Sequence, residues 1–385
     1  MELNTSLVDT SLVIKDYLKM IESFGVDKGF NDGDFKHIYT NEINKKHFLS
    51  VIMRTQGQRL FAMGQALTCL LSQADQDFYL MICIHNQIEN DETNNQVVEL
   101  LQTFPGSLTQ STNIFSVVGG KRGVPMNVCI DLSNSDYVVF LDDDDLVTAE
   151  WVGTFKATQI DVPGTITRNR CVDRIVSKTQ NNKYCPQLTK SDWLVSRSND
   201  FRYIESLERN SSPLHSYAIP LDQIKKCGTF VDTTYDVAED WDYLMRNAAI
   251  SGVTSQPATT AIYNRWDSDG SSLHLHDEDT WSGIHESAID KLTSNPALIT
   301  AVEVKELYSL LATMYQLNDL VSMVKQNDGF GTIHEKMNKL NRLELYMDMK
   351  IKDEFDNKPI KQSNLKRIQN ISYRIVRKLK KALRL

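Results

Sequence analysis

Four consecutive aspartates, Asp142 to Asp145, are the residues of this sequence best suited to chemistry. They follow an apolar run at 137–141 (YVVFL), whose β-branched and aromatic residues indicate a buried strand. Four negative charges at a strand end repel one another unless a cation or hydrogen-bond donors offset them. Carboxylate oxygens suit Mg²⁺ or Mn²⁺, which share their coordination shell with phosphate oxygens. The run predicts a metal site that holds a di- or triphosphate, with a solvated acidic turn as the alternative.

A second group of carboxylates, Glu239, Asp240 and Asp242, falls within one turn of a helix expected over 237–250. Carboxylates near a helix start are favoured by the helix dipole, and taken alone the pattern favours that interpretation. The alternative is a general base. A hydroxyl is too weakly acidic to attack unaided, and a carboxylate within hydrogen-bond reach can take its proton.

A third segment, 119–130 (GGKRGVPMNVCI), combines glycines, two cations and a following helix. Its backbone N–H groups, with Lys121 or Arg122, are suited to phosphate or ribose oxygens. The segment does not match the G-x-x-x-x-G-K-[ST] phosphate loop, so it is a weak signal alone.

The elements around these segments alternate between strand and helix. Strands are expected at 48–53, 78–84, 113–118 and 137–141, and helices at 58–72, around Val97 and Leu101, and at 124–134. This alternation predicts a largely parallel sheet with right-handed crossovers. From 165 to 295 the pattern is mixed, and helical periodicity dominates from 297 onward.

In this order and at these distances, the segments resemble the family-2 glycosyltransferases with the GT-A fold, over roughly residues 48–275. The matching segments are the first strand and nucleotide loop (SVIMRTQGQR, 50–59), the segment before the metal motif (KRGVPMNVCI, 121–130), the strand with its D-x-D motif (YVVFLDDDD, 137–145), two acceptor-side loops (213–216 and 227–230), the helix with its following arginine (AEDWDYLMR, 238–246), and the closing strand and loop (263–265 and 270–272).

The resemblance implies an α/β fold with a Rossmann-like mixed sheet flanked by helices. It also implies an inverting enzyme that transfers a sugar from a nucleotide-diphosphate donor to a hydroxyl of a glycan or glycoconjugate, in surface polysaccharide biosynthesis. Mn²⁺ or Mg²⁺ is the implied cofactor, because a cation neutralises charge on the leaving nucleoside diphosphate.

Site residues follow from the same resemblance. Asp144 is expected to bind the cation, Asp142 to contact the ribose or the metal, and Asp143 or Asp145 to support it. The implied metal set is Asp142, Asp144 and Asp145, and the implied donor-binding set is Thr55, Arg59, Arg122, Asn127, Asp142 and Asp143. Asp240 is the expected base, with Glu239 binding the acceptor or orienting the loop.

One departure concerns the nucleobase. Family members often end the second strand with an acidic residue that reads the base, whereas this strand ends at Ile84-His85-Asn86. We add His85 to the donor-binding set because His85 or Asn86 could bond a base edge. A strand-end histidine without a ligand is an equal alternative.

Two other functions remain open at this point. A nucleotidyltransferase acting on a sugar phosphate also uses carboxylates, a divalent cation and an α/β sheet, but only 54–58 (RTQGQ) faintly resembles its first strand–helix turn. The non-enzyme alternative is a glycosyltransferase-like protein that only binds a partner or a glycan.

Composition narrows the class further. The chain has 385 residues, 41% of them hydrophobic and 24% charged, which is ordinary for a globular enzyme. A net charge of −8 argues against nucleic-acid binding. Its six cysteines show no C-x-x-C spacing, and no signal peptide or membrane span is expected, so we expect a cytoplasmic protein.

We expect a helical extension over 1–46, a catalytic domain over 47–295 and a helical module over 296–385. The catalytic domain divides into a nucleotide-binding half, 47–145, and an acceptor half, 146–295. Residues 357–385 carry ten basic residues and no acidic one, on a helical apolar repeat. Such a helix suits the inner face of an anionic membrane, and the alternatives are packing on the catalytic domain or on another subunit of an oligomer.

Overall fold

The computed structural model describes residues 35–42, 45–179, 187–194, 197–208, 210–267 and scattered residues between 283 and 315. The chain divides into two compact units, Met1–Val304 and Lys305–Leu385, and the elements below belong to the first. The strands are β1 (Phe35–Tyr39), β2 (His47–Thr55), β3 (Phe78–Asn86), β4 (Thr112–Val118), β5 (Ser135–Phe140), β6 (Leu146–Val147), β7 (Ile166–Lys178), β8 (Gln187–Thr189), β9 (Tyr217–Pro220) and β10 (Val253–Trp266). The helices are α2 (Leu60–Leu71), α3 (Asp91–Gln102), α4 (Gly106–Thr109), α5 (Gly123–Leu132), α6 (Trp151–Asp161), α7 (Tyr203–Glu208), α8 (Leu221–Cys227) and α9 (Glu239–Ser251), with a 3₁₀ turn at Leu214–Ser216.

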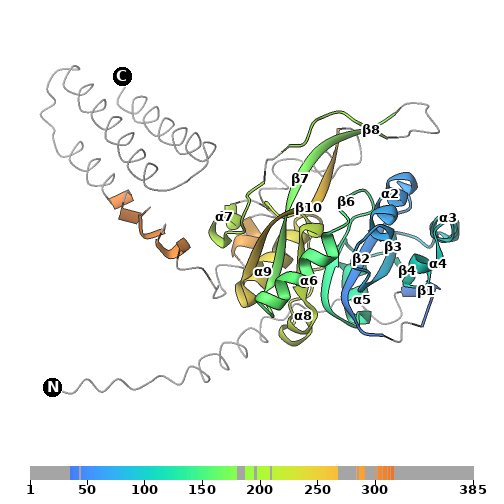
Figure 1. Ribbon diagram of the computed structural model, residues 1–385, viewed down its shortest axis with the longest axis horizontal. Helices are drawn as coiled ribbons and strands as arrows, with labels where there is room; N and C mark the ends of the chain where they lie inside the picture. Colours follow the sequence, from blue (N-terminus) through green and yellow to red (C-terminus); the bar gives the residue numbers. More distant parts are fainter. Residues whose placement is uncertain are drawn as a thin grey trace, which may run out of the picture. The chain divides into compact units, whose positions relative to one another are not determined.

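The described strands join in one sheet in the order β1-β4-β3-β2-β5-β9-β7-β10-β6, with β8 beside β7 (Figure 1). Strands β4, β3, β2 and β5 are parallel, as the alternation of strands and helices predicts. Strand β9 runs antiparallel to both β5 and β7, and β7 is again parallel to β10. The expected α/β class, a mixed sheet flanked by helices, is therefore confirmed.

Two hydrophobic cores lie on opposite faces of this sheet. Val51 and Met53 pack with α2, α3 and α6, whereas Ile52 packs with α5, α8 and α9. This division follows from strand geometry, because successive side chains point to opposite faces. Both faces are covered, which explains why β2 and β3 read as continuous apolar runs rather than as alternating ones.

The N-terminal boundary differs from the expectation of a helical extension over 1–46. Residues Phe35–Tyr39 form β1, an edge strand antiparallel to β4. Its aromatic rings anchor it, because Phe35 and His37 both lie edge-on against Phe115. Five residues of mixed exposure carry too little periodicity to reveal such a strand. The expected helix before residue 35, the boundary at 295/296 and the basic segment 357–385 lie outside the described residues and stay predictions.

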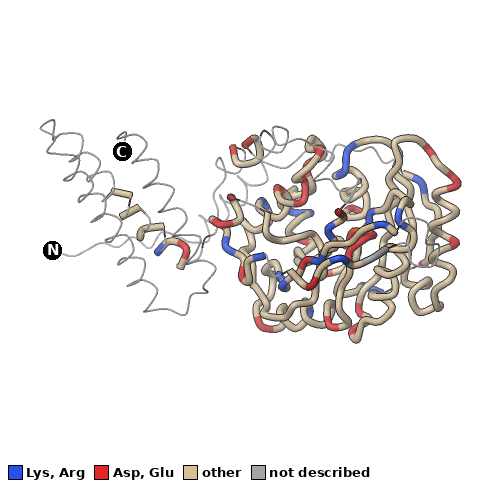
Figure 2. Tube along the Cα trace, turned by 90° about the horizontal axis from the view of Figure 1, so that it is seen from above, with Lys and Arg blue, Asp and Glu red and all other residues tan. Residues whose placement is uncertain are grey.

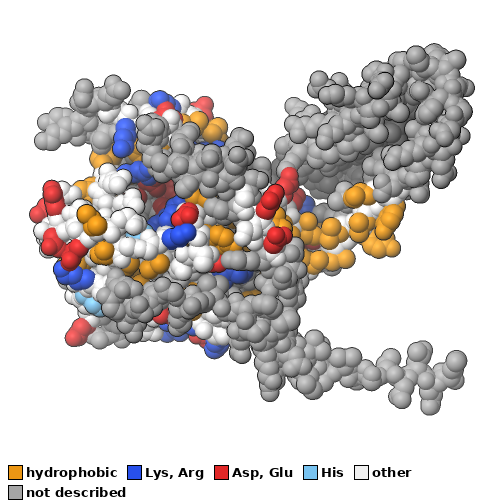
Figure 3. All heavy atoms as spheres, turned by 180° about the vertical axis from the view of Figure 1, so that it is seen from behind, with side chains coloured by type: hydrophobic (Ala, Val, Ile, Leu, Met, Phe, Trp, Pro, Cys, Tyr) orange, Lys and Arg blue, Asp and Glu red, His pale blue; other side chains and the backbone are white. Residues whose placement is uncertain are grey.

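Charge is distributed rather than segregated in the first unit. Figure 2 shows acidic and basic stretches of the trace next to one another in the middle of this unit. On the face seen in Figure 3, acidic and basic side chains also lie side by side.

Candidate active site

The aspartate run lies where β2 and β5 end together. These strands are parallel, with Ile52 opposite Phe140, so Thr55 and the aspartates meet at one edge of the sheet. Thr55 Oγ1 donates a hydrogen bond to Asp143 Oδ2 at 2.5 Å and accepts one from the Gly57 N–H at 2.9 Å. The structure thus brings together Thr55 and Asp143, two predicted donor-binding residues, at the edge where open α/β sheets bind ligands.

Asp144 holds two donors on a single oxygen. Its Oδ2 forms an ion pair with Arg59 and accepts a hydrogen bond from the Trp266 indole N–H at 2.8 Å. The Arg59 guanidinium also lies over the Trp266 ring, 4.8 Å from its centroid. The Asp144 backbone carbonyl accepts from the Asn264 side chain at 2.5 Å. Asp144 and Arg59 therefore share a corner of the site with the end of β10.

Asp145 does not join its neighbours, which corrects its place in the predicted metal set. Its carboxylate is buried, pairs with His215 Nδ1 at 3.1 Å and accepts from the Asn264 backbone N–H at 2.8 Å. Burial alone would lower the pKa of His215, but the Asp145 carboxylate outweighs it and raises that pKa to about 10. Asp145 and His215 thus form a buried ion pair beneath the site.

The aspartates that face the site repel one another. Burial, followed by the nearby Asp142 charge, raises the pKa of Asp143 to about 6. Burial and the charges of Asp145 and Asp143 raise the pKa of Asp144 well above its ordinary value. The nearby charge of Arg59 lowers both pKa values, and Arg54 also lowers that of Asp143, but they do not cancel the rise. The cluster therefore has fewer positive than negative charges.

A divalent cation fits this cluster. Asp142 and Asp144 are partly exposed, and their hard oxygens suit Mg²⁺ or Mn²⁺. Among the described residues, no three His, Cys, Asp or Glu side chains form a complete metal cage. A hard cation that takes one or two carboxylates and completes its shell with phosphate and water needs no such cage.

A largely buried arginine joins the aspartates to the second acidic group. Arg54, just before Thr55, reaches Asp142 Oδ1 at 3.5 Å with one nitrogen and Glu239 Oε1 at 3.3 Å with the other. Arg122 Nε lies 3.1 Å from the same Glu239 oxygen. Glu239 is almost fully buried and shared by two arginines at the start of α9, an environment that favours an orienting role over acceptor binding. One sequence feature could have pointed to Arg54: it is a lone charge at the end of an otherwise apolar strand.

Asp240, the second residue of α9, has both carboxylate oxygens held by hydrogen-bond donors. Its Oδ1 accepts from the Trp241 N–H at 2.8 Å, and its Oδ2 accepts from the Asn210 side chain at 3.1 Å. Burial, followed by repulsion from Glu239, raises the pKa of Asp240 to about 6, with Arg122 opposing the rise. Such a carboxylate is ionised at neutral pH yet more basic than an ordinary aspartate. Nothing in the sequence pattern pointed to Asn210.

The residue before this acidic pair has an unusual backbone. Ala238 has φ 63°, and within the described part of the chain it is the one non-glycine residue with positive φ. A side chain in this left-handed region costs roughly 1–2 kcal/mol. The surrounding packing must supply that energy to turn the chain sharply into α9. The strain therefore lies next to the two carboxylates of the site.

Two predicted donor-binding residues have structural partners instead. His85 is buried, and its Nε2 donates to the Gly119 carbonyl at 3.0 Å, which ties the end of β3 to the loop after β4. Asn127 is fully buried in α5, donates to the Val231 carbonyl at 2.8 Å and accepts from the Val231 N–H at 2.9 Å. These partners favour structural roles: His85 holds the loop after β4, and Asn127 holds the segment around Val231 before α9.

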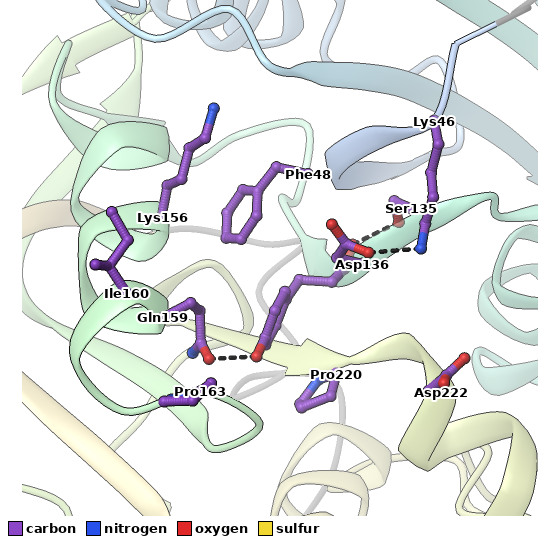
Figure 4. Close-up of a pocket in the computed structure, with 11 residues that line it drawn as sticks. Lys46, Phe48, Ser135, Asp136, Lys156, Gln159, Ile160, Pro163, Pro220 and Asp222 are labelled. Carbon is purple, nitrogen blue, oxygen red and sulfur yellow. Dashed lines mark hydrogen bonds and ion pairs between the residues drawn. The ribbon is translucent and has the colours of Figure 1, made fainter.

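The pocket in Figure 4 lies elsewhere. Its volume is about 410 Å³, and Phe48 and Tyr137 line it near the amino ends of β2 and β5 (Figure 4). Lys46 and Asp136 at its rim pair with each other at 2.6 Å. The aspartates follow the opposite ends of the same strands. This hollow is therefore not the candidate active site.

Comparisons with known proteins add a fold-level similarity. No protein-family model matches the sequence, and no curated protein matches it. The structure of S. aureus TarS 1-349 in complex with UDP-GlcNAc is 15% identical over 78% of this chain and 80% of that chain, with a TM-score of 0.49. Another structure of TarS 1-349 is also 15% identical, and the match spans 56% of this chain and 60% of that one, with a TM-score of 0.41.

The mannosyltransferase PcManGT from Pyrobaculum calidifontis, in complex with GDP-Man and Mn²⁺, is 12% identical over 96% of this chain and 93% of that chain, with a TM-score of 0.48. Similarities of this size leave the chemistry of the site to be argued from its own residues.

The structural role of Asn127 can be tested by stability. Asn127→Ala should lower the free energy of unfolding by about 2–4 kcal/mol, because both polar groups of buried Val231 lose their partner. Urea denaturation measures this, with exposed Asn134→Ala as the matched control. A stable Asn127→Ala variant that no longer binds UDP or GDP would contradict a purely structural role for Asn127.

The raised pKa of Asp240 predicts a pH-dependent change in stability. Because its folded pKa of about 6 exceeds the ordinary value of 3.8, the folded state binds an extra proton between these values and loses stability as pH rises through them. The free energy of unfolding of Asp240→Asn, relative to wild type, should therefore be about 2 kcal/mol more favourable at pH 8 than at pH 4. A pH-independent loss is expected on top of this, because asparagine cannot accept both hydrogen bonds.

Urea denaturation of the metal-free protein at the two pH values measures this difference. Asp222→Asn is the control, because a hydrogen bond from Lys226 lowers the pKa of Asp222 and its loss should not stabilise at pH 8. Equal effects of Asp240→Asn at both pH values would show that its carboxylate is not destabilised by ionisation.

Proposed function

We propose that this protein is a metal-dependent inverting glycosyltransferase of family 2 with the GT-A fold. It transfers a sugar from a nucleotide-diphosphate donor to a hydroxyl of a glycan or glycoconjugate. We also propose that this transfer serves surface polysaccharide biosynthesis. In the described part of the chain no helix is both long and apolar enough to cross a bilayer.

The observation that carries this proposal is the bridge through Arg54. The two terminal nitrogens of its guanidinium contact Asp142 of the aspartate run and Glu239 beside Asp240, although Arg54 and Glu239 are 185 residues apart. The aspartates proposed to hold the cation and the carboxylate proposed as base are thus linked through one side chain. Chemistry that needs a held diphosphate and a separate base has both components there.

The base step follows from the surroundings of Asp240. The acceptor hydroxyl gives its proton to the Asp240 carboxylate as its oxygen forms a bond to the anomeric carbon of the donor. The bond from that carbon to the diphosphate oxygen breaks on the opposite side, so the configuration inverts. Asn210 holds one carboxylate oxygen and the Trp241 N–H holds the other, which keeps the base in one orientation.

The diphosphate side uses the other half of the site. Asp142 and Asp144 would hold the cation, which supplies positive charge to the leaving nucleoside diphosphate. Thr55 orients Asp143, and Arg54 keeps Asp142 directed at the site. Arg122, partly exposed beside Glu239, is the cation best placed among the predicted residues to contact donor oxygens.

Asp240→Asn tests the base assignment. With Mn²⁺ and UDP-GlcNAc or GDP-mannose, the ligands of the two similar structures, we expect the rate of nucleoside diphosphate release to fall by about 10²–10⁴-fold. Calorimetric affinity for the donor should change little, because the base contacts the acceptor. Asp222→Asn, on the exposed surface of α8, is the charge-matched control.

Two outcomes would contradict the proposal. Loss of donor affinity in Asp240→Asn would place this carboxylate at the donor rather than at the acceptor. Release of pyrophosphate from a nucleoside triphosphate and a sugar phosphate would indicate a nucleotidyltransferase.

A further inference from the structure

Arg59 occupies the position at Asp144 that a cation would need. Asp144 Oδ2 already holds the Arg59 guanidinium and the Trp266 N–H. A metal ion on this oxygen would meet the guanidinium charge at close range, so the two cations compete.

Residues from other elements form the position that Arg59 occupies. Its guanidinium pairs with Asp144 and lies over the face of the Trp266 ring, a favourable cation–π arrangement. Trp266 packs against Ala62 of α2 and Val176 of β7, so its indole is held firmly. The Trp266 N–H also fixes the Asp144 oxygen that Arg59 contacts. Arg59 thus sits in a formed site rather than on open surface.

Arg59 is also placed to change partners. It immediately precedes α2, and no side chain caps the first turn of that helix. Backbone N–H groups at a helix start, with an arginine beside them, favour a phosphate. A diphosphate held by the aspartate-bound cation would offer Arg59 new oxygens as it leaves Asp144.

We propose that Arg59 is an internal counter-ion that occupies the metal position at Asp144 until a nucleoside diphosphate draws it away. This inference rests on the metal site of the proposed function. It makes the metal and the diphosphate bind cooperatively, because each favours the state in which Arg59 has left Asp144. By linkage, the nucleotide must raise metal affinity by the same factor as the metal raises nucleotide affinity.

The test is Mn²⁺ binding, measured by electron paramagnetic resonance with and without UDP or GDP. Without nucleotide, Arg59→Gln should bind Mn²⁺ about tenfold more tightly than the wild type, because the competing charge is gone. Nucleotide should tighten Mn²⁺ binding strongly in the wild type and much less in Arg59→Gln. Arg59→Lys keeps the charge and should stay close to the wild type.

Lys156→Gln is the matched control, because it removes one positive charge at the rim of the Figure 4 pocket, where Lys156 pairs with Asp77 at 2.7 Å. It should leave Mn²⁺ affinity unchanged. Equal Mn²⁺ affinity in the wild type and Arg59→Gln would overturn the inference and leave the proposed function standing. Mn²⁺ binding that Asp144→Asn does not weaken would overturn both, because the metal would then lie elsewhere.

A second measurement needs no change at Arg59. Mg²⁺ together with UDP or GDP should alter tryptophan emission as the guanidinium leaves the indole, and Trp266→Phe should remove that change. An identical emission change in Trp266→Phe would show that Arg59 stays in place, which contradicts the inference.

Discussion

The contact on which the site depends is the largely buried Arg54 guanidinium, which pairs with both Asp142 and Glu239. Breaking a buried pair by removing one partner leaves an uncompensated charge in a poorly solvated place. Here one cation serves two carboxylates from distant parts of the chain. Without it, Asp142 would lose this ion pair and buried Glu239 would keep only Arg122. The two halves of the site, the loop after β5 and the start of α9, are therefore held at a set separation by one side chain.

Charge balance explains much of the remaining geometry. Five carboxylates, Asp142, Asp143, Asp144, Glu239 and Asp240, face three guanidinium groups, those of Arg54, Arg59 and Arg122. If all are ionised, two negative charges are left over. Burial is the main cause of the raised pKa values of Asp143 and Asp240, and repulsion from neighbouring carboxylates adds to it. A divalent cation would remove this excess of negative charge. In the metal-free protein Arg59 offsets part of the carboxylate charge by pairing with Asp144.

Much of the site was predictable because the motifs lie at element ends. A run of aspartates after an apolar strand must emerge at the sheet edge, and three acids in one helical turn must lie at a helix start. What could not be predicted was which carboxylate of a run turns inward. Asp145 differs from Asp144 by one position, yet the pairing of β6 with β10 directs it to His215 and the Asn264 N–H.

The amino-acid sequence by itself determined the α/β class, the parallel strands around β2 and the position of the acidic groups, because periodicity and strand-end chemistry are local properties. Only the tertiary structure decided that Arg54 spans both groups, that Asn210 holds Asp240 and that Arg59 rests on Trp266 and Asp144. Those contacts join residues far apart in the chain. They depend on the reversed strand β9 and the long pair β7–β10, whose arrangement no local pattern encodes.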